Sequence, residues 1–421
     1  MTVALITTAV ILIMYGAVSE PLDRRGATSA MIFTAAGLAV GTSGLGLIDL
    51  KLESIVAERF CELALVFVLF SDSTRIDLAG LRGHLAWPSR LLLIGLPITI
   101  LAGLGAGILV FPGMALASAF LLSTMLCSTD AALGQRVVSD EAVPVRVRQA
   151  LDIESGLNDG LATPVVLFAI AAASGLADGS TEHAFVKALV EIAIGAAVGA
   201  AAGYLSGRLL DTAHDRGWSQ QDLVPVAVLV VPLLSYYAAH GAGGNGFIAA
   251  FVAGTMFALG QVDLDRMHSQ LELTDQVAAL LGFAVWMLFG TAIAVHLGAL
   301  VQWQNLGFAV LSLTVLRMVP VALCLLGSGL RPPSVLFIGW FGPRGLASVV
   351  FALIALESLD VSADVSKTAG VIATTVVLSV LAHGYTATPW ARRYGAWASG
   401  PAHPTVETQA AVAPRRTSSR A

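Results

Sequence analysis

Residues 151–170 read LDIESGLNDGLATPVVLFAI, an apolar run that contains charged and polar side chains. It lies within a longer apolar segment at 147–173 and carries two acidic residues, Glu154 and Asp159. A membrane-spanning helix needs about 20 mostly apolar residues. A rise of about 1.5 Å per residue places Asp159 about 16 Å beyond Arg148, near the middle of a hydrocarbon core. The stretch therefore predicts a membrane helix with a carboxylate at its centre.

The composition of the whole chain also favours lipid as its solvent. Of 421 residues, 56% are hydrophobic and 12% are charged, and the mean hydropathy is +0.81. A soluble domain carries about 25% charged residues. The net charge of −5, with no basic block, argues against a nucleic-acid partner. We expect no nucleotide and no cofactor. The sequence contains neither an HExxH nor a GxSxG motif, either of which would indicate an intramembrane enzyme.

Reading apolar length along the chain predicts an all-α protein with about thirteen transmembrane helices. We assign residues 1–392 to this membrane domain and 393–421, rich in Ala, Pro, Ser and Thr, to a disordered cytoplasmic tail. The expected spans are 2–18, 27–45, 53–72, 89–111, 114–135, 147–173, 184–210, 222–240, 245–261, 275–301, 305–327, 333–356 and 367–391.

The basic residues predict the orientation of these spans. Cytoplasmic loops of membrane proteins are enriched in Lys and Arg. With the N-terminus outside, the outer loops hold only Lys51, Lys187 and Lys367, and the remaining loop arginines are cytoplasmic. We therefore expect a multi-pass protein of the cell (inner) membrane with its C-terminus in the cytoplasm.

Five charges from four predicted helices converge near mid-membrane: Asp130, Glu154, Asp159, Arg317 and Arg344. Charge at this depth is costly and by default marks a function or a partner. Glu154 is expected to pair with Arg317 or Arg344, because an unpaired buried charge would be neutralised. Three carboxylates and two guanidinium groups sum to −1, which suits one monovalent cation or one proton. Asp72, near the end of the third span, is a further candidate for this cluster.

Side chains on the sixth span fall on two faces. Ser155 and Asp159 are four residues apart and share one face, which Thr163 continues. Glu154 and Asn158 share the adjacent face. One helix thus offers a carboxylate with a hydroxyl one turn away, and a second carboxylate directed elsewhere.

Two helix breaks accompany these charges. Gly342-Pro343-Arg344-Gly345 interrupts the twelfth span, because proline lacks an N–H and clashes within a helix. In the fifth span, the side chains of Ser128, Thr129 and Asp130 compete for backbone hydrogen bonds. Broken helices in matching places of two inverted halves point to a transporter site, and a freed carbonyl such as that of Thr129 can bind a cation.

These residues together resemble the monovalent cation/proton antiporters of the NhaP type, relatives of the animal sodium/proton exchangers, over about residues 5–392. The resemblance implies two inverted repeats, broken and crossing helices five and twelve, and a homodimer. It also implies that Asp159 binds cation or proton and that Asp130, Ser155 and the Thr129 carbonyl complete the cation shell.

The resemblance assigns supporting roles as well. It implies that Glu154 pairs with Arg317, that Asn158 is structural and that Arg344 offsets charge at the helix crossing. An Asn-Asp pair, here Asn158-Asp159, marks the electroneutral branch. Relatives often carry Glu near the end of helix three, where this chain has Asp72.

These features predict a secondary active antiporter that exchanges Na⁺ for H⁺ with 1:1 stoichiometry in pH and cation homeostasis. K⁺ or Li⁺ as substrate, an electrogenic exchanger and a passive cation channel remain alternatives. Two further patterns have open readings. Gly195, Gly199, Gly203 and Gly207, spaced by four, predict close helix packing or a dimer contact. His383, placed near an outer helix end or a loop, is a candidate pH sensor.

Overall fold

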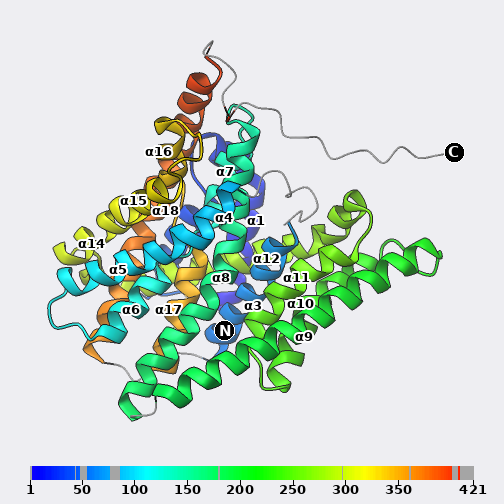
Figure 1. The fold of residues 1–421 in the computed structure, drawn as a ribbon, viewed down its shortest axis with the longest axis horizontal. Helices are drawn as coiled ribbons and strands as arrows, with labels where there is room; N and C mark the ends of the chain where they lie inside the picture. Colours follow the sequence, from blue (N-terminus) through cyan, green and yellow to red (C-terminus); the bar gives the residue numbers. More distant parts are fainter. Residues whose placement is uncertain are drawn as a thin grey trace.

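The computed structural model describes residues 2–42, 44–47, 55–75, 86–178, 181–295, 297–359, 362–400 and 406–407, and their regular structure is entirely helical (Figure 1). Eight of these helices are long and apolar enough to cross a membrane, and four shorter apolar helices accompany them. The multi-pass helical fold is therefore confirmed, whereas the count of about thirteen spans stays a prediction. The helices are α1 (Thr2–Arg24), α2 (Ser29–Val40), α3 (Ile55–Thr74), α4 (Ala86–Arg90), the π-helical turn η2 (Leu91–Gly95), α5 (Leu96–Val110), α6 (Leu116–Met125), α7 (Ala131–Val138), α8 (Val145–Asp178), α9 (Thr181–Asp215), α10 (Val224–Gly241), α11 (Gly246–Gly260), α12 (Leu264–Val295), α13 (Leu297–Leu300), α14 (Trp303–Leu313), α15 (Val315–Cys324), α16 (Pro332–Trp340), α17 (Leu346–Ser358) and α18 (Ala363–Ala398).

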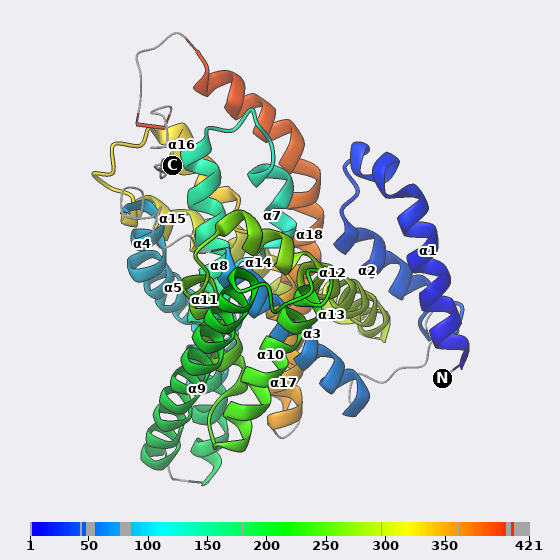
Figure 2. The same ribbon diagram turned by 90° about the vertical axis from the view of Figure 1, so that its right-hand side faces the viewer.

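The helices pack as two bundles. In the first, α12 packs on α2, α3 and α10, and α11 packs on α3, α9 and α10. In the second, α4 to α8 pack with α14 to α18. Figures 1 and 2 show α9, α10 and α11 side by side, with α1 and α2 at another edge. Helix α8 contacts α3, α9 and α11 of the first bundle as well as α6 and α7 of the second. Helix α8 therefore lies where the two bundles meet, as does α17, which contacts α3 and α12.

The glycine run of the seventh predicted span packs α9 against α11 within one chain. A Cβ atom at Gly199 would lie 2.3 Å from the carbonyl oxygen of Ala249, and one at Gly203 would lie 2.2 Å from that of Ala253. Only a hydrogen in place of a side chain allows backbones to approach this closely. The structure therefore uses these glycines for close helix packing inside the chain.

Two broken helices cross at their breaks. The fifth predicted span consists of α6 and α7, separated by residues 126–130, and the twelfth consists of α16 and α17, separated by residues 341–345. The backbone N–H of Asp130 donates to the carbonyl of Pro343 at 2.8 Å, so the two interruptions are directly bonded. The two breaks are those that the sequence predicted, and their crossing is the one that the family resemblance implied.

Helix α18, the last long helix, packs against the break in the twelfth span. His383 lies well inside α18 and is buried, so its predicted place near an outer helix end is wrong. Its Nε2 lies 2.9 Å from the carbonyl oxygen of Trp340, the last residue of α16. One turn earlier, the Ser379 hydroxyl accepts a hydrogen bond from the Arg344 backbone N–H at 2.7 Å. Helix α18 therefore satisfies polar backbone groups that the break in the twelfth span exposes.

The tail predicted over 393–421 falls mostly outside the described residues. Within it, α18 continues to Ala398, and Val406 and Glu407 are also described. The Glu407 carboxylate accepts hydrogen bonds from the Ser334 hydroxyl at 2.8 Å and the Arg331 backbone N–H at 2.9 Å, at the start of α16. The domain boundary at residue 392 stays a prediction.

Candidate functional site

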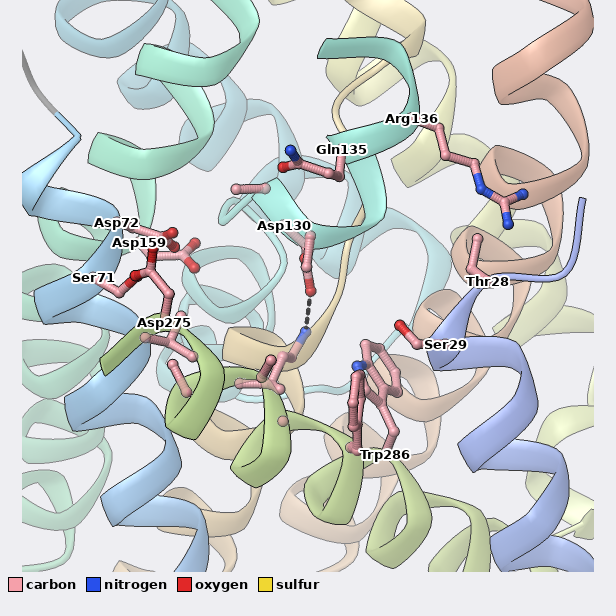
Figure 3. A pocket seen from close by; sticks show the side chains of 18 of the residues that line it. Thr28, Ser29, Ser71, Asp72, Asp130, Gln135, Arg136, Asp159, Asp275 and Trp286 are labelled. Carbon is pink, nitrogen blue, oxygen red and sulfur yellow. Dashed lines mark hydrogen bonds between the residues drawn. The ribbon is translucent and has the colours of Figure 1, made fainter. Parts of the chain in front are cut away.

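A cavity of about 360 Å³ lies where the two bundles meet. Residues of α1, α2, α3, α7, α8, α12 and α17 line it, with Asp130 between α6 and α7. Its wall carries an unusual number of acidic side chains for an apolar protein (Figure 3), together with two arginines. The charged lining residues are Asp23, Asp72, Asp130, Asp159, Asp275, Arg75 and Arg136.

Asp159 reaches this cavity from the middle of α8. Its side chain is buried, with 4% of the residue exposed. The Oδ1 atom has no hydrogen-bond partner among the described residues. Thr163, one turn further on, donates its hydroxyl to the Asp159 carbonyl at 2.7 Å and therefore does not satisfy the carboxylate. A buried carboxylate oxygen without a protein partner is costly, so a ligand is expected there.

Asp130 lies opposite Asp159 and caps two helices at once. Its Oδ1 accepts from the Leu133 N–H at 3.0 Å at the start of α7, and its Oδ2 accepts from the Leu346 N–H at 2.7 Å at the start of α17. Helix N-termini carry partial positive charge and unpaired N–H groups, which a carboxylate compensates. Each carboxylate oxygen retains a second lone pair, so Asp130 can still bind a cation from the cavity.

Two glycines allow the break in the twelfth span to fit around its charged neighbours. A Cβ atom at Gly345 would lie 1.8 Å from Asp130 Oδ2, and one at Gly342 would lie 2.3 Å from Arg317 Nε. Any side chain at either position would displace a charged group from its partner. The motif Gly342-Pro343-Arg344-Gly345 thus supplies a proline that interrupts the helix and glycines that admit Asp130 and Arg317.

The two buried arginines of the site have different partners. Arg317 on α15 forms a bidentate ion pair with Glu154 on α8, with N–O distances of 2.6 and 2.7 Å. Of the two partners that the sequence left open for Glu154, the structure therefore has Arg317. Arg344 Nη1 instead donates to the carbonyls of Cys127 and Ser128, at 2.7 and 2.9 Å. It compensates the carbonyl end of α6, where the helix breaks.

The other predicted ligands lie behind the cavity wall. Asn158 Nδ2 donates to Thr129 Oγ1 at 3.1 Å, and the Thr129 hydroxyl donates to Ser155 Oγ at 3.4 Å. All three side chains are buried, and none of them lines the cavity. Of the four residues predicted to bind the cation, the structure therefore brings Asp130 and Asp159 to the cavity and places Ser155 and Thr129 in the hydrogen-bonded layer next to it.

The far wall holds Asp72, which the sequence offered as a further candidate, and Asp275, which the sequence analysis did not assign to the site. Asp72 of α3 lines the cavity, and so does Asp275 of α12. The Ser71 hydroxyl donates to Asp275 Oδ1, and Arg75 Nη2 lies 3.7 Å from Asp275 Oδ2. Figure 3 shows Ser71, Asp72 and Asp275 near Asp159. Asp275 begins a predicted apolar segment, and a charge at that place could have been read as part of the site.

Among the five charges predicted near mid-membrane, only Asp159 has no compensating partner among the described residues. Glu154 and Arg317 neutralise each other, Arg344 faces backbone carbonyls, and Asp130 faces two helix N-termini. Asp159 Oδ1 has no such compensation within the described structure. The arrangement defines an all-helical membrane protein with crossed, broken helices and a buried carboxylate that opens to a cavity.

Comparison with known proteins identifies the family. The sodium/hydrogen exchanger transmembrane family matches residues 6–393, so the chain belongs to this family. A K⁺/H⁺ antiporter NhaP from Alkalimonas amylolytica is 25% identical over 336 residues, which are 79% of this chain and 56% of that protein. A probable Na⁺/H⁺ antiporter from Schizosaccharomyces pombe is 24% identical over 340 residues, covering 74% of this chain and 43% of that protein. The chain thus spans about half the length of these curated relatives.

A solved structure shares the fold. The sodium proton antiporter MjNhaP1 from Methanocaldococcus jannaschii, determined at pH 8, superposes with a TM-score of 0.73 at 18% sequence identity. The match covers 92% of this chain and 97% of that one. The antiporter fold predicted from the sequence is therefore confirmed over nearly the whole chain.

Proposed function

We propose that this protein is a secondary active antiporter that exchanges a monovalent cation for H⁺ at Asp159, with Na⁺ as the leading candidate for the cation. The observation that carries the proposal is the Asp159 carboxylate, which is buried, faces a cavity and has one oxygen without a partner among the described residues. Membership of the sodium/hydrogen exchanger family supports it. The role is that of a transporter and not of an enzyme.

Cation binding at this place follows from the available ligands. Na⁺ and K⁺ prefer hard oxygen ligands, and Asp159 and Asp130 present carboxylate oxygens to one cavity. Ser155 and Thr129 lie in the adjoining layer, so their oxygens join the shell after a small rearrangement. Asn158 supports this layer through its bond to Thr129. Asp72 adds negative charge on the opposite wall.

A 1:1 exchange follows from the charge of the site. A bound proton and a bound monovalent cation each neutralise the Asp159 carboxylate. The site therefore carries the same net charge when it moves a cation one way across the membrane as when it moves a proton the other way. Glu154, Asp130 and Arg344 already have partners, so Asp159 is the carboxylate of this five-charge cluster that is available to exchange its bound ion. Relative movement of the two bundles around this site would expose it to each side of the membrane in turn.

The cavity extends to the end of the molecule at which Asp23 pairs with Arg136, at 2.6 Å. Arg24 and Arg25 lie at the same end of α1, and basic residues mark the cytoplasmic side. We therefore propose that the cavity faces the cytoplasm, with the N-terminus outside, in the cell membrane. A homodimer remains part of the proposal.

The experiment measures cation-dependent collapse of a pH gradient in proteoliposomes. Wild-type protein is expected to dissipate the gradient on addition of Na⁺, and Asp159→Asn is expected to abolish this response while remaining monodisperse. Glu141→Gln, which removes a carboxylate from an exposed loop, serves as the matched control and should behave as wild type. Exchange by Asp159→Asn at the wild-type rate would refute the assignment.

K⁺ is the second candidate substrate, because relatives of this chain include proteins named K⁺/H⁺ antiporters. The same assay, run in turn with Na⁺, K⁺ and Li⁺, ranks the ions. Clamping the voltage tests stoichiometry: a 1:1 exchanger keeps its rate, whereas an electrogenic exchanger changes it. Single-channel currents would indicate a passive pore.

A further inference from the structure

An arginine at the end of α3, Arg75, lies near three acidic side chains: Asp72, Asp152 and Asp275. Arg75 Nη2 lies 3.7 Å from Asp275 Oδ2 on α12. Asp72 precedes Arg75 by three residues, the spacing at which side chains on a helix are neighbours. Within the described residues, Arg75 forms its ion pair with Asp275, and Asp72 is close enough to attract the same guanidinium without forming an ion pair.

The alternative partner lies beside the transport carboxylate. A Cβ atom at Gly156, three residues before Asp159, would lie 3.2 Å from the Asp72 carbonyl oxygen, so α3 passes very close to α8 here. Asp72, Arg75, Asp159 and Asp275 all line the same cavity. A guanidinium that moved from Asp275 to Asp72 would therefore carry its positive charge toward Asp159.

A tethered cation at that position would compete with the transported one. Groups joined by a short flexible connection meet at effective concentrations of about millimolar, and arginine matches carboxylates well through its planar fork. The Arg75 and Asp275 side chains are 38% and 40% exposed, so water screens their attraction and the pair is readily exchanged. The position of this arginine is therefore sensitive to small changes on α12.

We propose that Asp275 is a positioning residue that holds the Arg75 guanidinium against α12, which leaves the carboxylates of Asp72 and Asp159 free for the transported cation. The Ser71 hydroxyl donates to the other Asp275 oxygen and fixes the orientation of the carboxylate. The inference rests on the proposed exchange at Asp159, and it assigns a determinant of cation affinity to the opposite wall of the cavity.

A double-mutant cycle on the KM for Na⁺ tests this assignment in proteoliposomes. Asp275→Asn is expected to raise KM about two- to fivefold at unchanged maximal rate, since an exposed ion pair of this kind is weak. Arg75→Gln in the wild-type background should leave KM nearly unchanged, because Asp275 already holds the arginine. Adding Arg75→Gln to Asp275→Asn should return KM to the wild-type value.

A general effect of cavity charge would give a different pattern. In that case Arg75→Gln would lower KM by the same factor in both backgrounds, and this additivity would overturn the inference. Asp275→Glu should keep the wild-type KM because it restores the charge. Ser71→Ala should give a smaller rise than Asp275→Asn. Glu272→Gln, a charge removed one turn away on an exposed position of α12, is the matched control and should leave KM unchanged.

The outcomes also separate this inference from the function on which it rests. A wild-type protein without cation-dependent proton flux would overturn the proposed function, and the inference with it. A wild-type protein that exchanges ions normally, combined with an Asp275→Asn variant of unchanged KM, would overturn the inference alone.

Discussion

Arg317 and Glu154 form two parallel hydrogen bonds inside the protein, Nη1 to Oε1 at 2.6 Å and Nη2 to Oε2 at 2.7 Å. Both residues are buried, at 4% and 1% exposure. Glu154 precedes Asp159 by five residues on α8, and Arg317 belongs to α15. The pair therefore fixes the helix that carries Asp159 to the bundle that contains the broken twelfth span.

Removing one member of this pair should destabilise the protein strongly. Glu154→Gln leaves the Arg317 charge buried without its carboxylate, and such a loss costs about 3–5 kcal/mol. Thermal unfolding of the purified protein in detergent measures the effect. A double variant, Glu154→Met with Arg317→Leu, should recover part of the stability, because it leaves no buried charge unpaired. A Glu154→Gln protein as stable as the wild type would contradict this view of the pair.

Proton and cation should compete for one group. If both bind Asp159, each unit of decrease in pH raises the apparent KM for Na⁺ by up to about tenfold once protons occupy most sites, by mass action. The maximal rate at saturating Na⁺ should stay constant over the same range. Initial rates of exchange at several pH values and Na⁺ concentrations test this. A KM independent of pH, with a falling maximal rate, would indicate separate proton and cation sites.

Gly345 should be intolerant of any side chain. Gly345→Ala places a Cβ atom 1.8 Å from the present position of Asp130 Oδ2, so Asp130 must leave the N-terminus of α17. Loss of such a cap costs about 0.5–2 kcal/mol, and the displaced carboxylate no longer faces the cavity correctly. We expect lower thermal stability and loss of Na⁺/H⁺ exchange.

A matched glycine provides the control for this substitution. Gly307 lies inside α14, and a Cβ atom there would have no neighbour within 4 Å. Gly307→Ala should therefore preserve exchange and raise stability by about 0.5–1 kcal/mol, since alanine is the better helix former. Equal behaviour of the two variants would show that the contact between Gly345 and Asp130 is unimportant.

The glycines of α9 should matter for stability of the single chain. Gly203→Val would push α9 away from α11, because even a Cβ atom would approach the Ala253 carbonyl oxygen to 2.2 Å. We expect a clear decrease in unfolding temperature, measured in detergent at several protein concentrations. Gly105→Val on α5, where nothing lies within 4 Å, should have little effect. A loss of stability that disappears at high protein concentration would favour a role between subunits.

Much of the site could be predicted from sequence, because charge inside apolar segments is conspicuous. Glu154, Asp159, Arg317 and Arg344 stand out in this way, and helix rise alone brings them to similar depth. Asp275 did not stand out, since it lies at the start of an apolar segment where a charge is unremarkable. His383 was placed wrongly because α18 runs from Ala363 to Ala398, which puts this residue well inside a long helix, where its ring nitrogen meets the carbonyl of Trp340.

The amino-acid sequence by itself determined that the chain crosses a membrane as helices, which of its helices break, and which charges lie inside. Lipid cannot hydrogen-bond a backbone or solvate a charge. Apolar spans, helix breaks and intramembrane charges can therefore be recognised from the order of the residues alone. Packing of the helices then selects Arg317 as the partner of Glu154, makes Asp130 the cap of two helices, and places Ser155 and Thr129 behind the cavity wall. Partner choice depends on which backbones approach across helices, and residues such as Gly345 that permit the approach reveal their partners only after folding.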